Sequence, residues 1–219
     1  MKRELEKQRN DLKQLTSQYS TRDIYNADEL ALFYMMLPNR TLADSSSEER
    51  GLKNSKERIT VMVCCNVDGS DKQRLYVINK SRNPHCFSSV RFNPNSIVQY
   101  YFNKKAWMTR DIFNDWIIKF NNRIRLNENN RKVLLLVDNC SGHLIEKRHF
   151  SNVRKELLPP NTTSELQPCD AGIIASLKSH YRRQLIDSLV SALDNYREFK
   201  TPNLKDALNM LVLAWKRVN

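Results

Sequence analysis

Glycine is scarce in this sequence, with only four among 219 residues. Neither a G-x-x-x-x-G-K loop nor a G-x-G-x-x-G turn is present, which excludes the nucleotide-binding folds that depend on those motifs. The five cysteines form no C-x-x-C pair, and adjacent Cys64 and Cys65 lie in an apolar run, so a disulfide scaffold or zinc ribbon is not expected. No apolar run approaches the roughly 20 residues of a membrane span, and the N-terminus is charged where a signal peptide is apolar. We therefore expect a soluble, intracellular protein without a membrane partner.

Positive charge, in contrast, is abundant. The chain has 36 Lys and Arg residues against 24 Asp and Glu residues, a formal net charge of +12. Hydrophobic residues make up 40% of the sequence, which is enough for a sizeable core, so the charge belongs to a folded domain and not to a disordered basic tail. A basic domain of this size favours a polyanionic partner, usually nucleic acid and less often an acidic membrane surface or an acidic protein.

The periodicity of apolar residues predicts alternating strands and helices. Residues 132–138 (KVLLLVD) contain an uninterrupted apolar run, typical of a central strand that is buried on both faces of a mixed sheet. The other predicted strands are 23–28, 59–67, 75–78, 97–102 and 153–158. The predicted helices are 2–17, 109–125, 143–150, 170–193 and 204–218, with an exposed loop over 43–57. The first helix is expected to flank the core, and the last one still runs at the end of the chain, which suggests a fragment.

Three aspartates occupy special positions in this pattern. Asp28 ends the first predicted strand, Asp138 ends the central strand, and Asp170 begins a long helix. If the two strands are neighbours, their ends bring Asp28 and Asp138 together, and a divalent cation would relieve the repulsion between the carboxylates. Two such ions can cut a phosphodiester without a nucleophilic side chain. The alternative is that each aspartate only forms a turn or caps a helix.

Several other residues are secondary candidates. Glu29 follows Asp28, and His143 lies five positions after Asp138, where it could approach a phosphate or cap a helix. Cys140 and His143 form half of a zinc motif without a second half, and Cys169 is expected to pack in the core.

Basic and aromatic residues add two further expectations. The helix after Asp170 carries three basic residues that either follow a DNA backbone or form a solvated face: Lys178, Arg182 and Arg183. Trp107 and Trp116 either pack in the core, which is the expectation, or stack on bases, and Trp215 is expected to face the core from its helix.

Five longer segments carry a family resemblance. They are YNADELALFYMMLPNRTL, KERITVMVCCNVDGS, NKKAWMT, VLLLVDNCSGH and LPPNTTSELQPCDAGIIASLKSHYRRQL. In this order they resemble the DDE endonuclease domain of the pogo and Tigger transposases and of their domesticated relatives, the jerky proteins and centromere protein B. The likeness covers roughly residues 20–218, nearly the whole chain.

The resemblance implies a fold class and a site. The fold would be α/β, a ribonuclease H-like mixed β-sheet flanked by helices, with residues 1–19 as a flanking helix or linker and 20–219 as the endonuclease domain. The catalytic and metal-binding acids would be Asp28, Asp138 and Asp170, holding two Mg²⁺ or Mn²⁺ ions. The third acid is Asp instead of Glu, as in the pogo branch.

The sequence also departs from the family pattern. Residues 28–33 read DELALF where DETGLF is common, and Glu156 stands where an apolar residue is usual, but neither change removes a ligand. The helix-turn-helix modules that read transposon ends are missing from this chain, which puts sequence-specific recognition of DNA in doubt.

Two functions follow from the resemblance. The first is a nuclear, transposase-derived DNA endonuclease that hydrolyses phosphodiester bonds and carries out strand transfer. The alternative is a domesticated nuclear DNA-binding or chromatin protein that keeps the fold without catalytic turnover. DNA is the partner in both, and a homodimer is an open alternative to a monomer.

Overall fold

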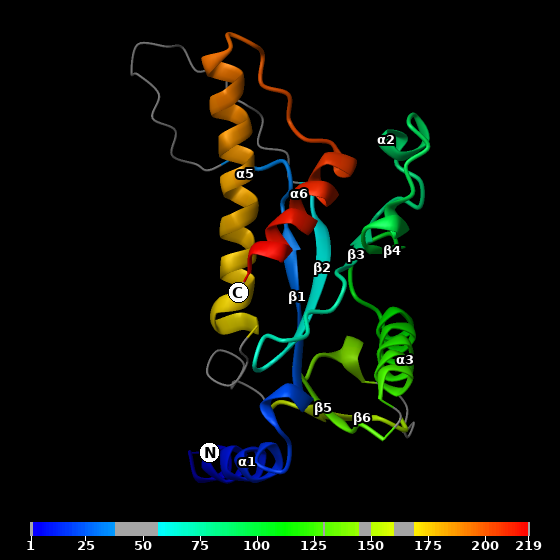
Figure 1. Ribbon diagram of the computed structural model, residues 1–219, viewed down its shortest axis with the longest axis vertical. Coiled ribbons are helices and arrows are strands. Elements are labelled where there is room, and N and C mark those ends of the chain that lie inside the picture. Colours follow the sequence, from blue (N-terminus) through cyan, green and yellow to red (C-terminus); the bar gives the residue numbers. More distant parts are fainter. Residues whose placement is uncertain (1, 38–56, 129, 145–149, 160–168, 219) are drawn as a thin grey trace. The chain divides into compact units, whose positions relative to one another are not determined.

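The computed structural model describes residues 2–37, 57–128, 130–144, 150–159 and 169–218 (Figure 1). The chain forms two compact units. The first unit contains residues 1–30, 62–76 and 107–174, and the second contains residues 31–61, 77–106 and 175–219. Within the described residues, no helix combines the length and apolar character needed to cross a membrane.

A six-stranded sheet with the order β4-β3-β2-β1-β5-β6 is the framework of the fold. The strands are β1 (Ile24–Leu32), β2 (Ile59–Asn66), β3 (Tyr76–Asn79), β4 (Gln99–Phe102), β5 (Val133–Val137) and β6 (Val153–Leu157). β5 pairs in parallel with both β1 and β6. The predicted mixed sheet with flanking helices is confirmed, and the apolar run of β5 is buried at all its positions, as expected for a central strand.

In the first unit, helices cover both faces of β1 and β5. α3 (Arg110–Asn127) begins at the predicted cap, because the Thr109 side chain accepts a hydrogen bond from the backbone N–H of Ile112. On the α3 side, the rings of Tyr25 and Phe120 meet edge to face, with centroids 5.1 Å apart. On the other face, Leu12 and Leu15 pack against an apolar cluster of Ile24, Leu134, Leu136 and Leu158. These two leucines belong to α1 (Lys2–Thr16), so the flanking helix contributes to the core.

The second unit contains α2 (His85–Ser88), α5 (Ile174–Asp194) and α6 (Leu204–Arg217). Asn203 and Asp206 form a capping box that starts α6. The Gln184 side chain donates a hydrogen bond to the Met210 carbonyl at 2.9 Å and so ties α5 to α6. The Tyr181 hydroxyl donates to the Tyr34 carbonyl at 2.9 Å, which anchors α5 to the segment after β1.

Three sequence expectations need correction. β1 does not end at Asp28 but continues to Leu32, because Leu30 and Leu32 are buried and extend the strand. Asp28 and Glu29 therefore lie inside the strand. Ser141–His143 is a short 3-10 helix, and the rest of the predicted helix falls on 145–149, outside the described residues. Trp107 is 55% exposed and not part of the core, whereas Trp116 and Trp215 are buried as expected.

Candidate metal centre

The pairing of β1 with β5 brings two of the predicted acids to neighbouring positions. Asn26 is paired with Leu136; Asp28 lies two residues further along β1, and Asp138 directly follows the last residue of β5. Within β1, Asn26 and Asp28 are two residues apart and therefore share a face. Asp28 is buried, with 7% of its surface exposed, and one of its carboxylate oxygens accepts the Glu29 backbone N–H at 2.7 Å.

The segment that contains the third acid is attached to the same face of β1. Asn26, which shares this face with Asp28, accepts a hydrogen bond from the Cys169 backbone N–H at 2.9 Å. The Cys169 thiol donates to the Asn26 carbonyl at 3.5 Å, and Cys169 is fully buried, which confirms the expected packing role. Asp170 follows in the short π-helix Cys169–Ile173; its side chain lies outside the described residues. Asn26 was not predicted, although a polar residue on the same strand face as Asp28 was a visible signal.

His143 links the opposite face of β1 to the end of β5. Its Nε2 lies 2.8 Å from Oε1 of Glu29, and its Nδ1 lies 2.5 Å from Oδ1 of Asp138. Both ring nitrogens therefore face carboxylate oxygens, which requires a proton on each and makes the ring an imidazolium. The Phe113 ring lies against it with centroids 4.4 Å apart, and the His143 side chain has no exposed surface.

The electrostatics of His143 are set by this environment. Burial opposes the charge, but contacts with Asp138, Cys140 and Glu29 outweigh it and raise the pKa of His143 to about 12. The contact with His143 in turn lowers the pKa of Asp138 against the opposing effect of burial. Lys155 was not predicted either; its ammonium donates to the His143 carbonyl at 2.6 Å and fixes the turn from the β6 side.

Among the groups at the end of β5, the Asp138 carboxylate is the one suited to Mg²⁺ or Mn²⁺, because the His143 imidazolium has no free lone pair and a thiol is a soft ligand. The ligand atoms of Asp138, Cys140 and His143 all lie within 4.8 Å of one another, and Asp28 is not in this group. Oδ1 of Asp138 is buried and accepts no well-aligned hydrogen bond, so its close approach to His143 is an ion pair that leaves lone pairs for another ligand. Carboxylate oxygens are the ligands preferred by Mg²⁺ and Mn²⁺. The Asp138 carboxylate is thus a candidate ligand of such an ion.

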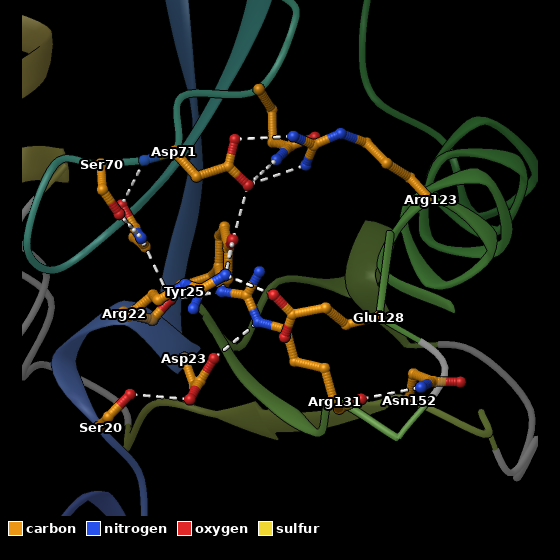
Figure 2. Close-up of polar contacts among 12 residues, drawn as sticks. Ser20, Arg22, Asp23, Tyr25, Ser70, Asp71, Arg123, Glu128, Arg131 and Asn152 are labelled. Carbon is orange, nitrogen blue, oxygen red and sulfur yellow. Dashed lines mark hydrogen bonds and ion pairs between the residues drawn. The ribbon is translucent and has the colours of Figure 1, made fainter. Parts of the chain in front are cut away.

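A second cluster of charged residues surrounds the start of β1, and here each acid is paired with an arginine (Figure 2). Asp71 accepts hydrogen bonds from both terminal nitrogens of Arg123, at 2.8 and 2.7 Å, and from the Tyr25 hydroxyl at 2.6 Å. Arg131 donates to Asp23 at 2.7 Å, and Arg22 pairs with Glu128 at 2.6 Å. Every carboxylate named here has a guanidinium partner, so this cluster has the properties of a structural network.

The basic residues predicted to follow a DNA backbone lie on α5. Arg182 and Arg183 are exposed and Lys178 is half-buried. All three belong to the second unit, whereas the acids and His143 belong to the first.

A mixed sheet flanked by helices is also the fold of a known transposase domain. The chain is similar to the crystal structure of the catalytic domain of Mos1 mariner transposase, with a TM-score of 0.50 and 15% identity, over 100% of this chain and 93% of that one. The Mos1 transposase paired-end complex with the left transposon end gives a TM-score of 0.52 and 16% identity, over 99% of this chain and 60% of that one. The predicted ribonuclease H-like fold is therefore confirmed: the chain has the fold of a transposase catalytic domain.

Relatives found by sequence comparison indicate the family within this fold class. Tigger transposable element-derived protein 4 of Mus musculus is 34% identical over 91% of this chain and 38% of its own length. CENP-B homolog protein 2 of Schizosaccharomyces pombe is 29% identical over 93% of this chain and 40% of its own length. Jerky protein homolog of Homo sapiens is 31% identical over 91% of this chain and 35% of its own length. The chain thus spans at most 40% of the length of these three relatives.

The family described as DDE superfamily endonuclease matches residues 56–219. The chain belongs to this family, and the predicted resemblance to Tigger, CENP-B and jerky proteins is confirmed.

Proposed function

We propose that the chain is the catalytic domain of a transposase-derived DNA endonuclease, with Asp28, Asp138 and Asp170 as the ligands of two Mg²⁺ or Mn²⁺ ions. The observation that supports this proposal is the parallel pairing of β1 with β5, in which Asn26 lies opposite Leu136, two residues before Asp28 and Asp138 respectively. The Cys169 backbone N–H donates a hydrogen bond to Asn26, and Asp170 is the next residue in the chain.

The acids and His143 have different tasks in this proposal. Asp28, Asp138 and Asp170 are the proposed carboxylate ligands of the ions. Glu29 and Asp138 hold the His143 ring between them, and this ion pair fixes the orientation of the Asp138 carboxylate. When bound, divalent ions supply Lewis-acid stabilisation of a phosphodiester and lower the pKa of a water molecule. We assign Glu29 and His143 as positioning residues.

DNA is the proposed substrate, and the nucleus the proposed location. The net charge of +12 gives the long-range attraction to a polyanion, and Lys178, Arg182 and Arg183 are proposed contacts to the sugar-phosphate backbone. The second candidate is a DNA-binding protein of this fold without turnover. It is supported by the relatives named as CENP-B homologs, one of which is 29% identical to this chain.

A plasmid-nicking assay separates the two candidates. In Mg²⁺ or Mn²⁺, the wild-type chain is expected to convert supercoiled DNA to the nicked form, and Asp138→Asn to reduce the rate by about 1,000-fold, equal to about 4 kcal/mol of barrier. Asp194→Asn makes the same substitution at an exposed acid on α5 and is expected to nick DNA at the wild-type rate. DNA binding without nicking by the folded wild type would support the second candidate. Equal nicking by Asp138→Asn and wild type would show that another site is responsible.

A further inference from the structure

Trp107 is a large aromatic side chain left at the surface beside the candidate metal centre. Of the three tryptophans, Trp116 is 2% exposed and Trp215 is 7% exposed, whereas Trp107 is 55% exposed. The backbone at Ala106, directly before it, has a positive φ of 51°, which is uncommon for a residue with a Cβ atom. The Thr60 hydroxyl stabilises this turn by donating to the Ala106 carbonyl at 2.6 Å. The fold therefore maintains a strained turn immediately before an exposed indole.

The residues after Trp107 attach this segment to the turn that contains His143. A Cβ atom added to Gly142 would lie 3.7 Å from both the Met108 side chain and the Met108 carbonyl oxygen, so Met108 is packed against that glycine. Arg110 donates a hydrogen bond from Nε to the Ser141 carbonyl at 3.1 Å. The next residue along this turn, His143, contacts Asp138. Met108 and Arg110 therefore contact the turn between Asp138 and His143, and Trp107 directly precedes Met108 in the chain.

We propose that Trp107 and Arg110 form a binding site for an unpaired nucleotide of the DNA strand held at the acids: the indole stacks on its base, and the guanidinium binds a phosphate. This inference rests on the proposed function, because it concerns the same substrate. Aromatic side chains bind single-stranded DNA by stacking on base faces, which are accessible only where the strands are separated. The guanidinium has five N–H donors, of which the bond to Ser141 uses one while fixing the orientation of the group.

Binding can be measured separately from cleavage, with calcium in place of magnesium. The probes are a blunt fluorescein-labelled duplex, the same duplex with an unpaired 3′ end, and a third in which the unpaired nucleotides are abasic. Fluorescence anisotropy gives the three affinities. For the wild type, we expect tighter binding of the unpaired end than of the blunt or abasic probe. Trp107→Ala should lower affinity for the unpaired end by about fivefold or more and leave blunt-duplex affinity unchanged.

Three matched variants sharpen the test. Trp107→Phe retains an aromatic face and should keep most of the preference for unpaired DNA. Tyr196→Ala removes an aromatic side chain that is 99% exposed in the second unit and should change nothing. Arg110→Gln should weaken binding of both probes with an unpaired end, including the abasic one, reduce the salt dependence of their binding by about one phosphate contact, and leave blunt-duplex affinity unchanged. Circular dichroism and thermal melting check that each variant is folded.

Intrinsic fluorescence gives an independent readout, because Trp107 is the one tryptophan exposed to a ligand. Unpaired DNA should quench the wild-type emission, and Trp107→Phe should remove that quenching. If Trp107→Ala binds the unpaired end as tightly as the wild type while the wild type still nicks plasmid, this inference is wrong and the proposed function stands. If the stacking signal is present but no metal supports nicking, the endonuclease proposal fails and the DNA site remains. A folded wild type that binds none of the probes at low salt would overturn both.

Discussion

Strand β1 carries two charged clusters, one at its start and one around Asp28 and Glu29, that lie in the same compact unit but differ in the partners of their acids. At its start, the acids Asp23, Asp71 and Glu128 pair with Arg131, Arg123 and Arg22 (Figure 2). Further along β1 are Asp28 and Glu29, with Asp138 on the neighbouring strand, and the single cation held between carboxylates is His143. The first cluster satisfies its own charges. In the second cluster, one imidazolium, His143, pairs with two carboxylates, Glu29 and Asp138.

The comparison separates a structural network from a binding site. Holding two carboxylates against one buried imidazolium is costly, and we expect a divalent cation to stabilise such a cluster. The presence of acidic residues does not distinguish the two clusters. They differ in the basic groups that contact the acids, which are guanidinium groups in the first cluster and the His143 ring in the second.

The largest expected effect comes from removing the cation of the acidic cluster. His143→Gln leaves Glu29 and Asp138 without the charge between them, and we expect the free energy of unfolding to fall by about 3 kcal/mol or more in metal-free buffer. Chemical denaturation measures this loss. Adding Glu29→Gln should recover part of it, because one of the two repelling carboxylates is then neutral. A loss below about 1 kcal/mol for His143→Gln would show that the ion pair is not the dominant contact there.

A smaller effect is expected when the balanced cluster loses one partner. Arg123→Met removes the guanidinium from Asp71, which keeps its hydrogen bond from Tyr25. Because the Arg123 side chain is 41% exposed, solvent screens the pair, and we expect a loss of about 1–2 kcal/mol in unfolding free energy. Magnesium should stabilise Arg123→Met by the same amount as the wild type. If magnesium raised the unfolding free energy of Arg123→Met more than that of the wild type, this cluster would also bind metal.

The smallest effect is the acid dependence of the balanced cluster. Burial of Asp71 opposes ionisation, but the hydrogen bonds from Arg123 and Tyr25 outweigh it and lower the pKa of Asp71. For Asp23, the bonds from Ser20 and Arg131 likewise outweigh burial and lower the pKa. A carboxyl whose pKa is lower in the folded state adds stability above its unfolded pKa of about 3.9, and this stability is lost as the pH falls through the folded value.

Urea denaturation across this acid range measures the effect. We expect stability of the wild type to decline below about pH 4, and Asp71→Asn to show a shallower decline with a lower plateau at neutral pH. An unchanged slope in Asp71→Asn would contradict the assigned ion pair. The measurement is made without metal, so that the acidic cluster does not contribute a metal-linked term.

The sequence was most informative where a pattern is local. The apolar run of β5 predicted a central strand with Asp138 at its end, and Thr109 was identified as the cap of α3. The contact between His143 and Glu29 could not be predicted from the sequence, because the two residues are 114 positions apart. The pairing of β1 with β5 brings them together. Trp107 was misassigned to the core for a related reason: its exposure depends on the turn at Ala106, which no periodicity of apolar residues reveals.

The most direct test of the central claim is a manganese titration by calorimetry on three folded chains: wild type, Asp138→Asn and Asp71→Asn. Each substitution neutralises one acid, the first in the acidic cluster and the second in the balanced one. The account predicts that wild type and Asp71→Asn bind manganese alike and that Asp138→Asn loses binding. No binding by the wild type, or equal binding by all three chains, would contradict the claim that the excess of acid on β1 and β5 is a metal site.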